Sequence, residues 1–143
     1  MPKTYTYHTA VTWKGEHWGH LVCGNGAEMD FSAPPDAHGH AGVLTPEDAF
    51  VAAANTCVMM MFLWACERFK IPLVAYACDA EGTKIIELDR TELFTKIVLR
   101  PKIRVKECDE TRLRRALQAA QKFSLVANSV KSEVTIEPEI LIQ

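Results

Sequence analysis

Several features that often guide the interpretation of a sequence are absent from these 143 residues. No arginine occurs before Arg68, so lysine and histidine supply all the positive side-chain charge of the N-terminal part. No CxxC pair occurs, and the cysteines are odd in number and widely spaced. This distribution argues against a disulfide scaffold and favours free thiols in a reducing cytoplasm. The cysteines are Cys23, Cys57, Cys66, Cys78 and Cys108.

A strong net charge is also lacking. The value of −2 gives no sign of a nucleic-acid or membrane-surface partner. The two basic runs, 96–106 and 112–115, are separated by acidic residues, so nucleic-acid binding is not expected. The first fifteen residues contain no apolar stretch of the kind found in secretory signals, which again favours a cytoplasmic location.

The sequence contains patterns typical of both strands and helices. Alternating residues over 4–13 predict a half-buried strand, and strands are also expected over 18–23 and 27–31 before a loop at 32–44. Pro101 is expected to place a bulge or an edge in a long alternating strand over 93–105. The other expected elements are a strand beginning at 74–78, a segment at 84–90, a helix over 109–122, a short helix capped by Ser124, and a last strand over 133–141. The pattern predicts an α+β fold with mostly antiparallel pairing.

The longest apolar segment, 49–66, lies inside a helix predicted for residues 45–69. Thr45 can cap this helix, and Pro46 suits its first position. Apolar residues occur on nearly every face, so the helix should be central and wrapped by other structure. Because the segment contains Asn55 and would be only about 27 Å long, we expect a buried core helix and no membrane span.

Cys57 lies within this helix. A cysteine in an apolar helix is more often an inert buried thiol, and Cys57 is too far from the helix N-terminus to benefit from its dipole. Three residues follow it at i+3, i+4 and i+7 and share its face, with Phe62 nearby. This group could line a pocket for a lipophilic molecule, or it could form core or dimer contacts. The three residues are Met60, Met61 and Trp64.

The run TPEDAFVAAANTCVMM (45–60) resembles the signature of the OsmC/Ohr family, the osmotically inducible and organic hydroperoxide resistance proteins. In that family a helix with a similar Pro-Glu start carries a reactive cysteine ten residues after the glutamate, and Glu47 and Cys57 keep that spacing. The resemblance continues at TKIVL (95–99) and AQKFSLVANSV (120–130). It implies an OsmC-like α+β domain over 1–143, with N-terminal strands and loop in 1–44, the central helix in 45–69, and the remaining elements in 70–143. The implied domain has antiparallel sheets around a long buried helix and forms an intertwined homodimer with active sites at the subunit interface.

The resemblance also implies an activity, the thiol-dependent reduction of organic hydroperoxides in the oxidative stress response, without a cofactor. It assigns the peroxidatic cysteine to Cys57 and carries Glu47 into the site. Ser124 stands where the family has its second cysteine, and a serine cannot form the disulfide of the usual cycle. We therefore expect a one-cysteine, peroxiredoxin-like peroxidase that uses an external thiol as reductant. With no arginine before the helix, His38 and His40 are weak substitutes for the family's activating arginine.

Alternatives to this assignment stay open. A non-catalytic dimer of the same fold could bind a small apolar ligand at its interface pocket, and Ser124 could be only a helix cap. One of the other cysteines could resolve the sulfenate in place of Ser124. The histidines of 16–20 and 38–40 have no familiar zinc spacing, so no metal is expected.

The spacing of Glu47 and Cys57 predicts how a shared site would be built. Ten residues of helix separate them by about 15 Å along the axis and roughly 80° around it. They cannot meet within one chain unless the helix breaks. We therefore expect the partner subunit to supply Glu47 if the two residues share a site.

Overall fold

The computed structural model describes residues 2–143. Two compact units make up the chain, one ending at Phe50 and the other extending from Val51 to Gln143. The boundary falls inside the first turns of the long helix α1 (Pro46–Arg68). The α+β class expected from the sequence is confirmed, with two sheets and one long helix.

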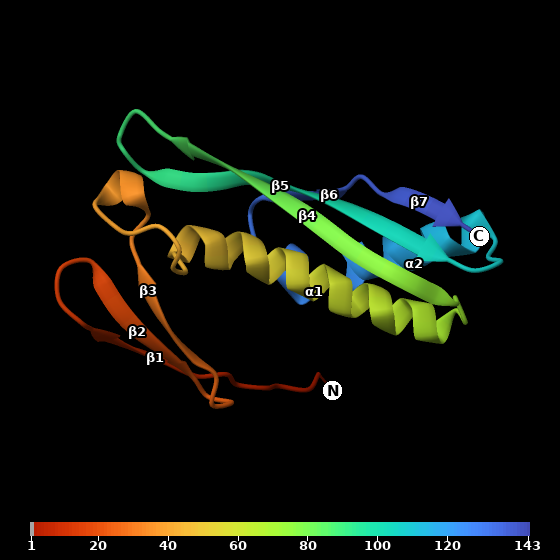
Figure 1. Cartoon of the computed structure of the whole chain (residues 1–143), viewed down its shortest axis with the longest axis horizontal. Coiled ribbons are helices and arrows are strands. Elements are labelled where there is room, and N and C mark those ends of the chain that lie inside the picture. Colours follow the sequence, from red (N-terminus) through yellow and green to blue (C-terminus); the bar gives the residue numbers. More distant parts are fainter. Residues whose placement is uncertain (1) are drawn as a thin grey trace. The chain divides into compact units, whose positions relative to one another are not determined.

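The first unit contains a three-stranded antiparallel sheet of β1 (Thr9–Trp13), β2 (Trp18–Cys23) and β3 (Glu28–Ser32), in that order (Figure 1). Tight turns join the strands. Gly15 and Gly26 in these turns have φ angles of 96° and 97°, a region that residues with a side chain rarely adopt. A short 3₁₀ helix, η1 (Pro35–Ala37), interrupts the loop that leads to α1.

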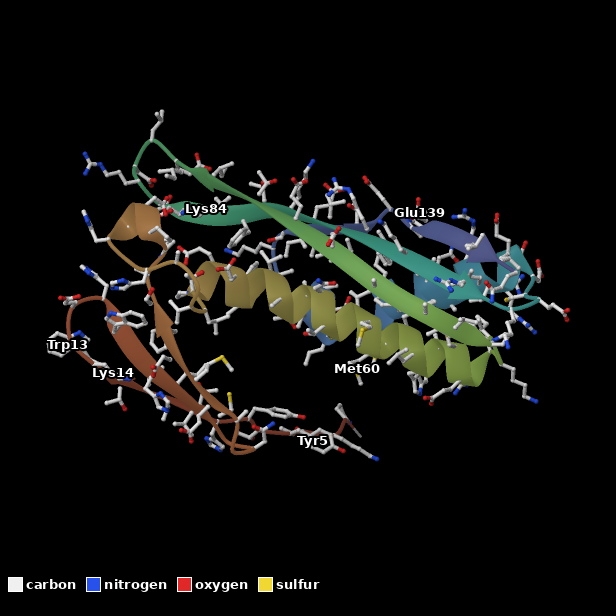
Figure 2. The ribbon with its side chains drawn as sticks, viewed as in Figure 1. Tyr5, Trp13, Lys14, Met60, Lys84 and Glu139 are labelled. Carbon is white, nitrogen blue, oxygen red and sulfur yellow. The ribbon has the colours of Figure 1, made fainter. Side chains whose placement is uncertain are left out.

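The apolar side of β1 is not buried, contrary to the prediction of a half-buried strand. The strand starts at Thr9, later than expected, and all five of its residues are exposed. Tyr5 and Trp13, labelled in Figure 2, are 72% and 77% exposed. Alternation predicts that one face of a strand is apolar, but it cannot tell whether the same chain or another molecule covers that face.

The long helix begins and ends within one residue of its predicted limits. At its start, the Thr45 hydroxyl accepts a hydrogen bond from the Asp48 backbone N–H at 3.1 Å and donates one to the Asp48 carboxylate at 2.8 Å. At its end, Lys70 has a φ of 55°, and the Ile71 N–H returns to the Cys66 carbonyl at 2.8 Å. This left-handed residue terminates the helix before Pro72.

The second unit is built on the hairpin of β4 (Leu73–Ile86) and β5 (Glu92–Val105), which Figure 1 shows alongside α1. The strand expected to begin at 74–78 continues through the polar segment to Ile86 as β4, so the segment expected at 84–90 belongs to β4 only in its first residues. On its other edge, β5 pairs with β6 (Glu133–Ile136) and then β7 (Glu139–Ile142), and both pairings are parallel. The predicted last strand is therefore present but split, and its parallel pairing differs from the antiparallel pairing of the rest.

Pro101 explains where the last strand is split. Its pairing with Cys78 on β4 continues without a bulge, so the irregularity predicted at Pro101 lies in the neighbouring strand instead. The carbonyls of Leu99 and Val105 both accept hydrogen bonds from the β6–β7 side. Pro101 lies an even number of residues from both, so its backbone points to the same side as theirs. Its nitrogen, which has no hydrogen, therefore faces the interruption between Ile136 and Glu139.

The helices α1, α2 (Glu110–Phe123) and α3 (Leu125–Ser129) complete the second unit. The apolar face of α2 is buried, as are the alternate residues of β5 from Ile97 to Val105. On α1, Phe62 is fully buried, and its ring lies 5.5 Å from that of Tyr76 on β4. The buried residues of α1 are Ala54, Val58, Phe62, Ala65 and Cys66.

The opposite side of α1 is open, so the prediction of a helix wrapped on all sides holds on one side only. Met60 is 55% exposed, and Figure 2 shows it on the side of α1 turned away from β4. By length and composition α1 could cross a membrane, and 28% of its most apolar window is buried. The stripe from Ala54 to Cys66 packs as in the core helix of a globular domain.

Candidate functional site

Cys57 and Ser124 are brought together by the fold although 67 residues separate them. Ser124 ends α2 and caps α3, with its Oγ accepting a hydrogen bond from the Ala127 N–H at 3.2 Å. The same hydroxyl donates to the Cys57 Sγ at 3.2 Å. Ser124 is fully buried and Cys57 is half-buried, so the pair lies just beneath the surface of the second unit.

The arrangement sets the direction of the hydroxyl proton. A serine hydroxyl has a single hydrogen, and the Ala127 N–H occupies one of its lone pairs, so the hydrogen is free to point at sulfur. A donor aimed at sulfur stabilises a thiolate or a sulfenate more than a neutral thiol. Ser124 therefore acts both as the cap predicted from the sequence and as a hydrogen-bond donor to Cys57.

The hydrogen bond to the Cys57 sulfur comes from a neutral hydroxyl. Within residues 2–143, no hydrogen bond joins a lysine, arginine or histidine side chain to Cys57. The ring of His40 stacks on Trp18 at 4.3 Å, and that of His38 lies 6.0 Å from His17. These contacts lie within the first unit, and the activating role expected for the two histidines stays a prediction.

Glu47 occupies the first turn of α1. Because α1 is unbroken, the axial separation of about 15 Å from Cys57 expected of a helix applies. Its Oε1 atom is buried and has no hydrogen-bond partner among the described residues. A carboxylate oxygen that is buried without a donor is costly. This orphan oxygen is consistent with a donor from another molecule, and its role in the site stays a prediction.

The residues proposed to line a pocket divide between two sides of α1. Met60 and Trp64 are exposed and Met61 is half-buried, whereas Phe62 points into the core against Tyr76. Phe62 therefore lies away from the surface that Met60 and Trp64 form.

Two further apolar residues flank Ser124 and were not identified from the sequence. Phe123 is 52% exposed and meets the ring of Trp64 edge-on at 6.2 Å, and Leu125 is 70% exposed. The guanidinium of Arg68 lies 5.4 Å over the Trp64 ring. The sequence feature that could have identified Phe123 and Leu125 is their position in AQKFSLVANSV. They stand on either side of Ser124, which matches the second cysteine of the family.

The remaining cysteines are free. Cys66 is nine residues from Cys57 in the same helix, about 13 Å along its axis. Burial, assisted by the charges of Cys108 and Glu67, raises the pKa of Cys66 to about 12. Burial is also the main cause of a raised pKa at Cys78. Both thiols are therefore poor nucleophiles. In the described part of the chain, no group of three His, Cys, Asp or Glu side chains is arranged to hold a metal.

Comparisons with known proteins place this geometry in a family. The family model described as OsmC-like protein matches residues 39–139. A comparison with curated protein sequences gives no significant match.

Solved structures share the fold over nearly the full chain. An OsmC-like protein of unknown function from Vibrio cholerae has 24% identity and a TM-score of 0.86, covering 94% of this chain and 99% of its own. An organic hydroperoxide resistance protein from Elizabethkingia anophelis has 16% identity and a TM-score of 0.77, with 100% of both chains covered. A third structure, the organic hydroperoxide resistance protein OhrB of Bacillus subtilis, has 18% identity and a TM-score of 0.64, covering 96% and 98%. The family match and the shared fold lead to one conclusion: the chain belongs to the OsmC-like protein family.

Proposed function

We propose that this protein reduces organic hydroperoxides with Cys57 as the nucleophile and a small thiol as the reductant. The observation that carries the proposal is the hydrogen bond of 3.2 Å from the buried Ser124 hydroxyl to the Cys57 sulfur. Support at the level of the family comes from the similar structures named as organic hydroperoxide resistance proteins. The free cysteines agree with a reducing cytoplasm.

The cycle needs one protein cysteine. The Cys57 thiolate attacks the outer oxygen of the hydroperoxide, the O–O bond breaks, and the alkoxide leaving group takes a proton to become an alcohol. Cys57 is then a sulfenic acid, whose sulfur the Ser124 hydroxyl can still reach. An external thiol condenses with the sulfenic acid to give a mixed disulfide and water. A second thiol then releases Cys57 as thiolate with formation of an external disulfide.

A homodimer is part of the proposal. Large apolar side chains are exposed on both units, among them Trp13 in the first and Met60 in the second. A soluble protein rarely leaves this much apolar surface uncovered, and a second copy would cover it. In such a dimer the partner's α1 would bring its Glu47 toward Cys57, as the axial spacing requires.

Turnover tests the proposal. Wild-type protein is incubated with cumene hydroperoxide and a small thiol such as 2-mercaptoethanol, and peroxide loss is followed. We expect catalytic consumption by the wild type and by Cys66→Ser, and none above background by Cys57→Ser. Equal consumption by wild type and Cys57→Ser would contradict the assignment of the nucleophile.

A non-catalytic binding function is the second candidate. It is favoured by the exposed apolar side chains of Met60, Trp64, Phe123 and Leu125. This function predicts that neutral apolar molecules bind and quench or shift the fluorescence of Trp64, while Cys57 stays reduced in the presence of peroxide. Peroxide turnover that depends on Cys57 would exclude it.

A further inference from the structure

A second concave site lies on the face of the β4–β5–β7 sheet that is turned away from the helices. Tyr76 and Ile103 point toward the helices, so the residues on either side of them in each strand point to the opposite face. A groove of about 600 Å³ occupies this outer face. The side chains that line it are Ala75 and Ala77 of β4, Lys102 and Arg104 of β5, and Glu139 and Leu141 of β7.

The strand register arranges these side chains in two rows. In one row Ala77 faces Lys102, which faces Glu139. In the other row Ala75 faces Arg104, which faces Leu141. Figure 2 shows Glu139 on the outer side of the sheet. The two alanines of β4 are short, whereas the side chains of β5 and β7 that line the groove are longer.

Arg100, on the same strand and the same face, differs sharply from Arg104. Carboxylates of Glu81 and Glu137 lie 3.2 and 3.3 Å from the Arg100 guanidinium and close the surface there. Arg104, four residues further on, faces an alanine on one side and a leucine on the other. The charge of Arg100 is therefore neutralised within the sheet, while Arg104 is placed between small and apolar neighbours.

We propose that this groove binds a small carboxylate with an aliphatic body. Arg104 would hold the carboxylate through two parallel N–H donors, the geometry in which arginine binds this group best. Lys102, about 7 Å along the strand, adds positive charge, and its neighbour Glu139 disfavours ligands with a second anionic group. The aliphatic body lies on Ala75, Ala77 and Leu141. The volume lies within the range of small-molecule sites.

The site is proposed separately from Cys57: the residues that line the groove do not include Cys57 or Ser124, whose hydroxyl hydrogen bonds join Cys57 and Ala127. Its occupancy can therefore be measured whether or not the protein is a peroxidase. Decanoate is the probe, decanol is the neutral analogue of equal length, and acetate has the charge without the body.

Titration of the full-length protein, followed by amide chemical shifts, tests the proposal. We expect decanoate to shift the amides of residues 75–77, 102–104 and 139–141, with a dissociation constant on the order of 1 mM for a ligand of this size. Decanol and acetate should bind at least about fivefold more weakly. Arg104→Gln should weaken decanoate binding about five- to tenfold, and Ala77→Leu, which fills the floor, should weaken it similarly. Lys96→Gln, on the same strand face but outside the groove, is the matched control and should bind like the wild type.

Three results would overturn the proposal. The first is the absence of amide shifts at these residues when the decanoate concentration is raised to 10-fold above the expected dissociation constant. The second is equal binding of decanol and decanoate, which would show that Arg104 contributes nothing. The third is a decanoate response centred on α1 that both groove variants leave unchanged.

Discussion

At the scale of single residues, the proposed function gives Ser124 a defined part in the reaction of Cys57. Its hydroxyl is buried, receives the Ala127 N–H, and donates to the sulfur. It can stabilise a thiolate or a sulfenate, but it cannot supply the second sulfur of a disulfide. The proposed cycle is therefore one that an external thiol completes.

Removal of the hydroxyl should separate its two roles. Ser124→Ala should slow sulfenate formation at Cys57 by about tenfold, because the sulfur loses its donor, and it should cost about 1 kcal/mol of unfolding free energy through the lost helix cap. Stopped-flow peroxide kinetics and urea denaturation measure the two effects. Ser129→Ala, at the other end of α3, is the control and should leave the peroxide rate unchanged.

Replacement by cysteine should restore a two-cysteine cycle. In Ser124→Cys, the introduced thiol would lie next to Cys57 and condense with its sulfenic acid, releasing water and forming an intramolecular disulfide. Mass spectrometry after one equivalent of peroxide should show a loss of two hydrogens and a 57–124 cross-linked peptide. Accumulation of a trappable sulfenate with no cross-link would show that the two positions are not adjacent in solution.

His20 offers a pH-dependent prediction in the first sheet. Hydrogen bonding to Asp30, and then to Glu28, raises the pKa of His20 above its ordinary 6.5. The contribution of protonated His20 to the stability of the folded state is therefore present in full below pH 6.5. It is lost as the pH rises through the higher pKa that His20 has in the folded protein. An NMR titration should give a midpoint above 6.5 that falls in Asp30→Asn, and falls less in Glu28→Gln. An unchanged midpoint in Asp30→Asn would contradict this cause.

The residues of the site could be predicted only in part. Cys57 and Ser124 were identified because each lies in a local motif, and their contact required the fold. Closeness to Cys57 in the sequence groups Phe62 with Met60, yet 100° of rotation per residue places Phe62 on the buried side. Phe123 and Leu125 were missed because exposed apolar residues next to a cap have no periodic signature.

At the scale of elements, α1 is a helix with one face in the core and one face open. Phe62→Ala should cost about 3–5 kcal/mol of unfolding free energy, because it removes a fully buried ring that packs on Tyr76. Thr56→Ala, at an exposed position of the same helix, should change stability by less than about 0.5 kcal/mol. Chemical denaturation measures both, and equal effects would contradict the orientation of α1.

The limits of the helices were predictable because caps are local: Thr45 and Ser124 accept the backbone hydrogen bonds expected of them, and Asp109 accepts one at the start of α2. The pairing of the last strand was not predictable. Its parallel direction depends on the path of the chain through α2 and α3, and its interruption depends on Pro101 in another strand. Neither is encoded within residues 133–141.

At the scale of the whole molecule, the exposed apolar surface leads to a prediction of oligomeric state. Light scattering should give about 32 kDa, twice the chain mass of 16.0 kDa. Met60→Glu should shift the protein toward monomer, because it places a charge on the open face of α1. Lys131→Glu, in an exposed loop position, should leave the mass unchanged. A wild-type monomer at tens of micromolar would contradict the dimer and the contribution of the partner's Glu47.

The most direct test of the central claim is the identity of the first oxidised atom. Wild-type protein is mixed with cumene hydroperoxide in slight excess together with a sulfenic-acid-selective reagent, and the labelled peptide is identified by mass spectrometry. We expect rapid labelling at Cys57, no labelling in Cys57→Ser, and no labelling of the buried Cys66. Labelling of any other cysteine first, or a Cys57 that stays reduced while peroxide persists, would contradict it.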